Sequence, residues 1–191
     1  MNRALLWNDL AKKGLLLGLL LALSLVIENR LMTSTMELLP LYGIYLIEWL
    51  VVVVAHYLML HYYTKSYGSL FGPEEGFSFG RAYNYVLLLS LFAGVVVALV
   101  QVVYLHYIVG YENYIEQLVA ALQRQLSGQE FPASVSVSLQ QSFSQMKSQP
   151  EPSVLTTAFG AIFNTLFFGI VYGLIVAGVL SRRPRLFDNQ A

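Results

Sequence analysis

YNYVLLLSLFAGVVVALVQVVYLHY, residues 83–107, is the stretch that decides the fold. It has no Asp, Glu, Lys or Arg, and at about 1.5 Å of helical rise per residue it can cross a hydrocarbon core of about 30 Å. Three further apolar stretches, residues 14–32, 41–61 and 154–180, have comparable lengths. In a chain of 191 residues that is 57% hydrophobic, these runs leave little room for a soluble domain. We predict an all-α integral membrane protein, one domain over residues 1–191, with four transmembrane helices.

The first apolar stretch also has features of a secretory signal peptide. Arg3, Lys12 and Lys13 precede a short leucine-rich core, as in the charged region of such peptides. However, the residues that follow the core, 28–31, read Glu-Asn-Arg-Leu and contain no small-residue cleavage site. We therefore expect a retained helix.

The positive charges predict an orientation for the four spans. If the N-terminus lies in the cytoplasm, eight Lys and Arg residues fall on the inner side and three on the outer side. The inner group is Arg3, Lys12, Lys13, Lys65, Arg81, Arg182, Arg183 and Arg185, and the outer group is Arg30, Arg124 and Lys147. Because cytoplasmic loops of membrane proteins carry the excess of Lys and Arg, both termini are predicted to be cytoplasmic.

Residues 109–153 form the one sizeable polar segment and would then face outward. Apolar residues recur at helical spacing in two parts of it. The first set is Tyr111, Tyr114, Ile115, Leu118, Val119 and Leu122, and the second, after Pro132, is Val135, Leu139, Phe143 and Met146. We predict an outward helical hairpin that either lies on the membrane surface or caps the bundle, since each apolar stripe needs cover.

Several residues mark the helix ends. Pro40 is placed for the first turn of the second helix, because its missing N–H has no helical partner there. Ser78 is expected to cap the third helix from outside. Tyrosines near the span ends, Tyr85 included, are expected to lie in aromatic belts at the membrane interface.

Small residues spaced four apart occur in three of the spans. They are Gly14, Gly18 and Ala22 in the first; Ser90, Gly94 and Ala98 in the third; and Gly169, Gly173 and Ala177 in the fourth. Such spacing lets two helix backbones approach closely. Packing within the bundle is favoured over a surface for a second protein, although one helix has two sides and both can hold.

Polar residues inside hydrocarbon are costly and are therefore candidate site residues. Glu48 is the strongest candidate, at roughly the depth of Gln101 and Asn164, with Glu28 and Arg30 near the outer end of the first helix. One interpretation is a proton-titrating or cation-binding site. The other, which we favour, is hydrogen bonding between helices, with Glu48 protonated or paired with Arg30.

The composition excludes several chemistries. The chain has no cysteine, which removes disulfides, thiolate catalysis and thiolate metal sites. His56 and His61 are five residues apart and therefore on different helix faces, unlike a zinc-binding pair at i and i+4. There is no Ser, His and Asp arrangement at one depth. We predict no enzyme activity, no cofactor, no metal and no nucleic-acid partner.

Four segments in this order carry a resemblance to a known family. They are Gly76-Phe-Ser-Phe-Gly-Arg-Ala, Tyr107-Ile-Val-Gly-Tyr-Glu, the stretch from Met146 to Pro152, and Phe168-Gly-Ile-Val-Tyr-Gly-Leu-Ile-Val-Ala. In these the chain resembles a family of small four-helix bacterial membrane proteins of unknown function. The resemblance implies the four-span topology and an address in the bacterial inner membrane, and it implies no activity. The loop departs from the family in having serine and glutamine where charged residues are expected.

These observations lead to a functional hypothesis. We expect a non-enzymatic structural or accessory subunit whose partners are the lipid bilayer and either a second copy or another membrane protein, held through small-residue helix faces. The alternative is a small transporter or channel with its polar site around Glu48. A sensor that uses the outward hairpin is a third, weaker option, because the inner loops are short for a cytoplasmic output.

Overall fold

A computed structural model describes residues 3–34, 36–72, 74–127 and 131–182. Within these ranges the chain is helical and has no β-strand. The elements are α1 Arg3–Met32, α2 Leu38–Gly68, α3 Phe79–Val102, the π-helical segment η1 Val103–Ile108, α4 Tyr111–Leu126, α5 Ala133–Ser148 and α6 Val154–Leu180. Arg183 and Arg185, which we assigned to the inner side, lie outside the described residues, as does the side chain of Arg3.

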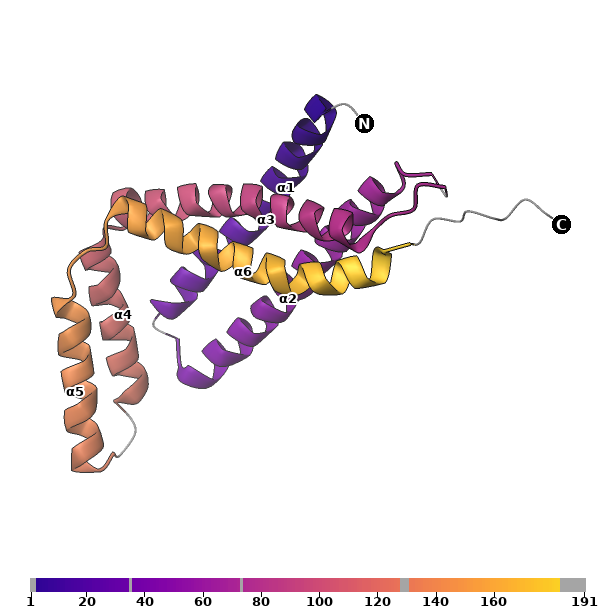
Figure 1. Cartoon of the computed structure of the whole chain (residues 1–191). Helices are drawn as coiled ribbons and strands as arrows, with labels where there is room; N and C mark the ends of the chain where they lie inside the picture. Colours follow the sequence, from indigo (N-terminus) through magenta and orange to yellow (C-terminus); the bar gives the residue numbers. More distant parts are fainter. Residues whose placement is uncertain (1–2, 35, 73, 128–130, 183–191) are drawn as a thin grey trace.

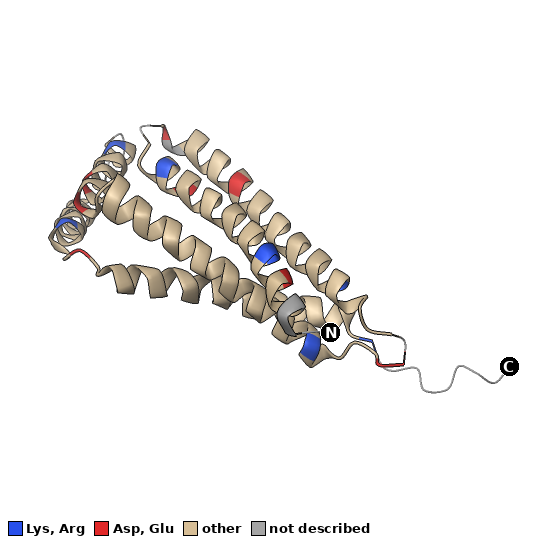
Figure 2. Cartoon of the chain, turned by 90° about the horizontal axis from the view of Figure 1, so that it is seen from above, with Lys and Arg blue, Asp and Glu red and all other residues tan. Residues whose placement is uncertain are grey.

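Within the described residues, four helices are long and apolar enough to span a membrane, the number that the sequence predicted. The spans are Leu6–Met32, Leu39–Gly68, Phe79–Ile108 and Val154–Leu180. Along them charged residues are sparse (Figure 2). The first three spans extend beyond the predicted limits, because backbone hydrogen bonding continues into the polar ends that a hydropathy reading leaves out.

The helix ends follow local side-chain chemistry. α2 begins at Leu38, three residues before the predicted start at residue 41, so that Pro40 lies within its first turn. The predicted cap of α3 is confirmed, since the Ser78 hydroxyl oxygen accepts a hydrogen bond from the backbone N–H of Arg81 at 3.3 Å. Ser153 caps α6 in the same way, with the backbone N–H of Thr156 as the donor at 3.2 Å.

The long helices pack as two pairs that cross (Figure 1). α3 and α6 lie side by side, and α1 and α2 cross them. We call the end where α2 leads into α3 the terminal end, and the opposite end, near α4 and α5, the hairpin end. The main apolar core lies toward the terminal end; its fully buried members are Leu10, Leu17, Leu60, Tyr85, Val86, Leu89, Ala93 and Val176.

The two short helices predicted within residues 109–153 are present. α4 and α5 lie beside each other at a steep angle to α3 and α6 (Figure 1). The change of direction occurs at Gly110, whose φ of 80° lies in the left-handed region that glycine adopts without strain. α4 buries Val119 and Ala121, whereas α5 buries no residue.

Candidate functional site

All nine predicted small residues are buried between helices of this chain. Ser90, Gly94 and Ala98 of α3 lie on the face that packs against α6, and Gly169, Gly173 and Ala177 lie on the matching face of α6. Gly14, Gly18 and Ala22 of α1 are buried against α3.

The glycines permit contacts that a larger residue would prevent. A Cβ atom built on Gly18 would lie 2.6 Å from the Cβ of Val96 and 2.8 Å from the carbonyl oxygen of Ala93. A Cβ atom on Gly169 would lie 2.5 Å from the Cβ of Ser90. These faces are therefore filled by helices of the same chain.

Glu48 lies between α1 and α2, where it meets a serine. The Ser24 hydroxyl donates a hydrogen bond to Oε1 of Glu48 at 2.5 Å. The other carboxyl oxygen, Oε2, is buried and has no partner among the described residues. The carboxyl group of Glu28 lies close enough for the two charges to interact. Two carboxyl groups thus share the hairpin-end half of the α1–α2 interface.

The other predicted members of the polar cluster do not join Glu48. Gln101 is half-buried on α3, Asn164 is exposed on α6, and Arg30 is exposed in the last turn of α1. Within the ranges that the structure covers, no hydrogen bond or ion pair links any of the three to Glu48. Similar depth along the spans therefore did not imply a hydrogen bond or an ion pair with Glu48.

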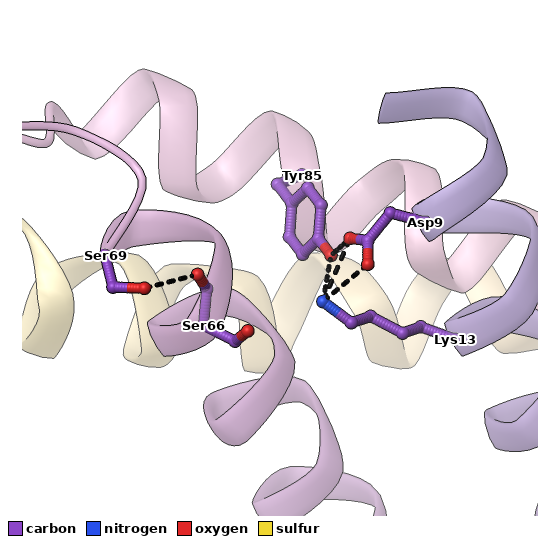
Figure 3. A network of polar contacts seen from close by, with 5 residues as sticks. All are labelled: Asp9, Lys13, Ser66, Ser69 and Tyr85. Carbon is purple, nitrogen blue, oxygen red and sulfur yellow. Dashed lines mark hydrogen bonds and ion pairs between the residues drawn. The ribbon is translucent and has the colours of Figure 1, made fainter. Parts of the chain in front are cut away.

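A second polar network lies at the terminal end and was not predicted (Figure 3). The Lys13 ammonium group pairs with Asp9 at 2.8 Å, one helical turn away on α1. The Tyr85 hydroxyl on α3 donates to Oδ2 of Asp9 at 2.6 Å and accepts from Lys13 at 3.3 Å. The network therefore ties α1 to α3 with hydrogen bonds to charged groups, which are stronger than neutral ones.

Aromatic rings from α2 extend this network. The ring of Tyr67 stacks on that of Tyr85, with centroids 4.2 Å apart and planes 6° from parallel. The Lys13 ammonium group lies 5.7 Å from the ring centroid of Tyr63, within the range of a cation–π contact. Tyr85 is 2% exposed, so its assignment to an interfacial belt was wrong. α1 and α2 cover the place where an interfacial tyrosine would meet water and lipid headgroups.

A histidine network connects η1 to the start of α6 at the hairpin end. Nδ1 of His106 lies 2.7 Å from a carboxyl oxygen of Glu151, and Nε2 lies 3.1 Å from the hydroxyl of Thr157. The side chain of His106 is only 8% exposed. The π-helical turn that presents it is a conformation often found at functional positions. Sequence reasoning did not predict that His106 contacts Glu151 and Thr157, because these residues come after α5, 45 and 51 positions later in the chain.

One hydrogen bond attaches α4 to α1. The Tyr114 hydroxyl donates to the side-chain oxygen of Asn29 at 3.0 Å. Burial raises the pKa of Tyr114 above its ordinary value, because the charged phenolate would lose its hydration. The neutral form that donates this hydrogen bond is therefore the stable one over the physiological range.

The two histidines of α2 contact different aromatic rings. His56 is 5% exposed and packs edge-on against the ring of Tyr172, with centroids 4.9 Å apart. His61 contacts Tyr57 instead. In the described part of the chain, no three His, Cys, Asp or Glu side chains gather in a group that could hold a metal ion.

Comparison with known proteins gives a family and no activity. A model of a family of proteins of unknown function, DUF4199, matches residues 12–182, which include most of the first span and all of the other three. Neither the curated proteins nor the solved structures give a match. The resemblance to a small membrane-protein family of unknown function is confirmed, and the chain belongs to the DUF4199 family.

Proposed function

We propose that this chain is a non-enzymatic subunit of the bacterial inner membrane, structural or accessory in role, that assembles with a second copy or another membrane protein. The observation that carries the proposal is Asn164. It is exposed on α6, ten residues after the helix begins, or about 15 Å along a span that crosses about 30 Å. Its side chain therefore lies near the middle of the hydrocarbon.

An amide in this position favours a protein partner. No side-chain hydrogen bond of Asn164 is present within the described residues. Lipid tails offer neither donors nor acceptors, whereas an Asn amide on a neighbouring helix offers both. Gly160, one turn earlier, has nothing within 4 Å of a Cβ built on it, so another helix backbone could approach closely there. The surface of α6 that turns away from α3 is accordingly the proposed interface.

The mass of the intact particle tests this proposal. We would extract the protein in mild detergent and measure the mass and composition of the particle by native mass spectrometry. Asn164→Leu should lose the partner, while Asn84→Leu, which removes an exposed amide near the terminal end of α3, should keep it. A wild-type monomer without a bound protein, or equal assembly in both variants, would contradict the proposal.

Glu48 supports a second candidate, a small transporter or channel coupled to protons or cations. Its buried Oε2, which has no partner among the described residues, its bond to Ser24 and the nearby carboxyl of Glu28 together form an acidic site inside a span. In proteoliposomes, Glu48→Gln should abolish an ion or proton flux, and Glu37→Gln, an exposed position at the start of α2, should not. Wild-type flux no greater than that of empty liposomes would remove this candidate.

The proposed orientation places both termini in the cytoplasm and the α4–α5 hairpin outside. Because the chain has no cysteine, single cysteines can be introduced and labelled one at a time. In intact cells, a cysteine at Ser144 on α5 should react with an impermeant maleimide, and one at Ser66 near the end of α2 should not. The opposite pattern would reverse the orientation.

A further inference from the structure

A pocket of about 250 Å³ opens at the terminal end, where α2 and α6 finish. Two basic side chains line it, Lys65 from α2 and Arg182 just beyond α6. Ser69 adds a hydroxyl group, and none of the described residues that line the pocket is acidic. Neither Lys65 nor Arg182 forms an ion pair with any residue that the structure describes. The described lining of the pocket thus has a net positive charge.

Arg182 is held in a fixed position at this pocket. Its backbone N–H donates to the carbonyl oxygen of Phe77 at 2.7 Å, and its own carbonyl oxygen accepts from the N–H of Phe77 at 2.9 Å. Its Nη2 donates to the carbonyl oxygen of Gly68 at 2.9 Å. A guanidinium group has five N–H donors, so most of them remain for a ligand. The backbone and one guanidinium nitrogen of Arg182 are therefore positioned before a ligand binds, which lowers the cost of binding.

The rest of the lining is apolar. Val179 and Leu180, the last residues of α6, lie beside the basic groups, and the buried ring of Phe77 closes another side. The pocket therefore has positive charge and hydrogen-bond donors next to the end of a membrane span. A phospholipid presents the complementary arrangement, with an anionic phosphate attached to apolar chains.

We propose that this pocket binds the headgroup of an anionic phospholipid. Lys65 and Arg182 contact the phosphate, and the acyl chains lie along Val179 and Leu180. Basic pockets between transmembrane helices on the cytoplasmic side are suited to anionic headgroups. The proposal requires only that the pocket face the lipid interface, and it is independent of whether the chain assembles with a partner.

Lipid binding to the purified full-length protein tests the proposal. In native mass spectrometry, phosphatidylglycerol should bind and remain bound at activation energies that remove phosphatidylcholine of the same chain length. Lys65→Gln should weaken phosphatidylglycerol binding about fivefold, the effect of one basic group near an anionic surface. Lys12→Gln is the matched control, because Lys12 is exposed on α1 at the same end of the bundle and does not line the pocket.

A second variant and a competitor complete the test. Arg182→Gln should weaken binding at least as much as Lys65→Gln, and circular dichroism would establish that each variant keeps its helices. Millimolar inorganic phosphate should leave the lipid bound. Displacement of the lipid by phosphate would indicate a soluble anion as the ligand and overturn the lipid assignment. Equal binding of the two lipids, or equal effects of Lys65→Gln and Lys12→Gln, would overturn the site itself.

Discussion

Replacing Gly169 by Ala adds one methyl group at the closest contact between α6 and α3. The new Cβ atom would lie 2.5 Å from the Cβ of Ser90 and would also overlap the Ser90 hydroxyl oxygen. Both Ser90 atoms are close to the α3 backbone, so a rotamer change cannot remove the overlap. The two helices must instead move apart.

The expected cost follows from comparison with a second glycine on the same helix. Overpacking a well-packed contact costs about 1–3 kcal/mol. Ala also favours the helix over Gly by roughly 1 kcal/mol, which opposes that cost. Gly178→Ala carries the same helix preference without the overlap, since nothing lies within 4 Å of a Cβ built there. Because the gain in helix preference is the same in both variants, it cancels when their free energies of unfolding are compared. Gly169→Ala should therefore be less stable than Gly178→Ala by about 1–3 kcal/mol.

A double-mutant cycle isolates the contact. We would measure the free energy of unfolding by titrating detergent-solubilised protein with SDS and following circular dichroism. Ser90→Gly removes the side chain that the new methyl meets, and it breaks no hydrogen bond, because the Ser90 hydroxyl has no partner among the described residues. The pair Gly169→Ala and Ser90→Gly should be more stable than the sum of the single changes predicts, by about 1 kcal/mol or more. Equal stability of Gly169→Ala and Gly178→Ala, or strict additivity in the cycle, would refute the proposed close contact.

Three further changes test other contacts by the same unfolding measurement. Tyr85→Phe removes the hydrogen bond to Asp9 and should destabilise the fold by about 1–2 kcal/mol; an effect no larger than that of Tyr62→Phe on the exposed side of α2 would contradict this role. Gly110→Ala has open space for the methyl group but requires a φ of 80°. It should therefore lower the free energy of unfolding by about 1–2 kcal/mol through backbone strain alone. An unchanged free energy of unfolding would show that the turn adopts another conformation. Tyr114→Phe should loosen α4 and increase its amide hydrogen exchange, because the bond to Asn29 is lost. Burial raises the pKa of Tyr114, so the contribution of this residue should be complete below pH ~10, the ordinary tyrosine value, and should decline as the pH rises through the raised pKa; α4 protection that is independent of pH up to strongly alkaline conditions would argue against it.

Features that depend on one segment could be predicted from the sequence. The four spans follow from the length and hydropathy of each stretch, and the Ser78 cap follows from a side chain and the N–H three residues later. The two short helices in the polar segment could be predicted for the same reason, because each has a stripe of apolar residues on a polar background.

Features that depend on the relative rotation of helices could not be predicted in this way. A transmembrane helix is apolar on all sides, so its sequence does not show which side faces a neighbour. Depth along the span placed Glu48 and Asn164 together, whereas Asn164 is exposed on α6 and no hydrogen bond links the two within the described residues. Because the relative rotation of the helices was unknown, two further contacts could not be predicted. These join Tyr85 to Asp9, 76 residues away, and His106 to Glu151, 45 residues away. The Asp9–Lys13 pair alone left a signal, since opposite charges four residues apart on a helix are neighbours.

The uneven burial of α2 has a consequence for the order in which the bundle opens. His56, Leu60 and Thr64 are buried in the half of α2 nearest the terminal end, whereas most of the other half is exposed. A segment with few buried contacts opens at a lower free energy than the rest of a protein. The hairpin-end half of α2 is therefore expected to separate from α1 while α1, α3 and α6 stay packed. Glu48 lies in that half, so a change in its charge would act on the least stable part of the bundle and shift its position with little cost to the remainder.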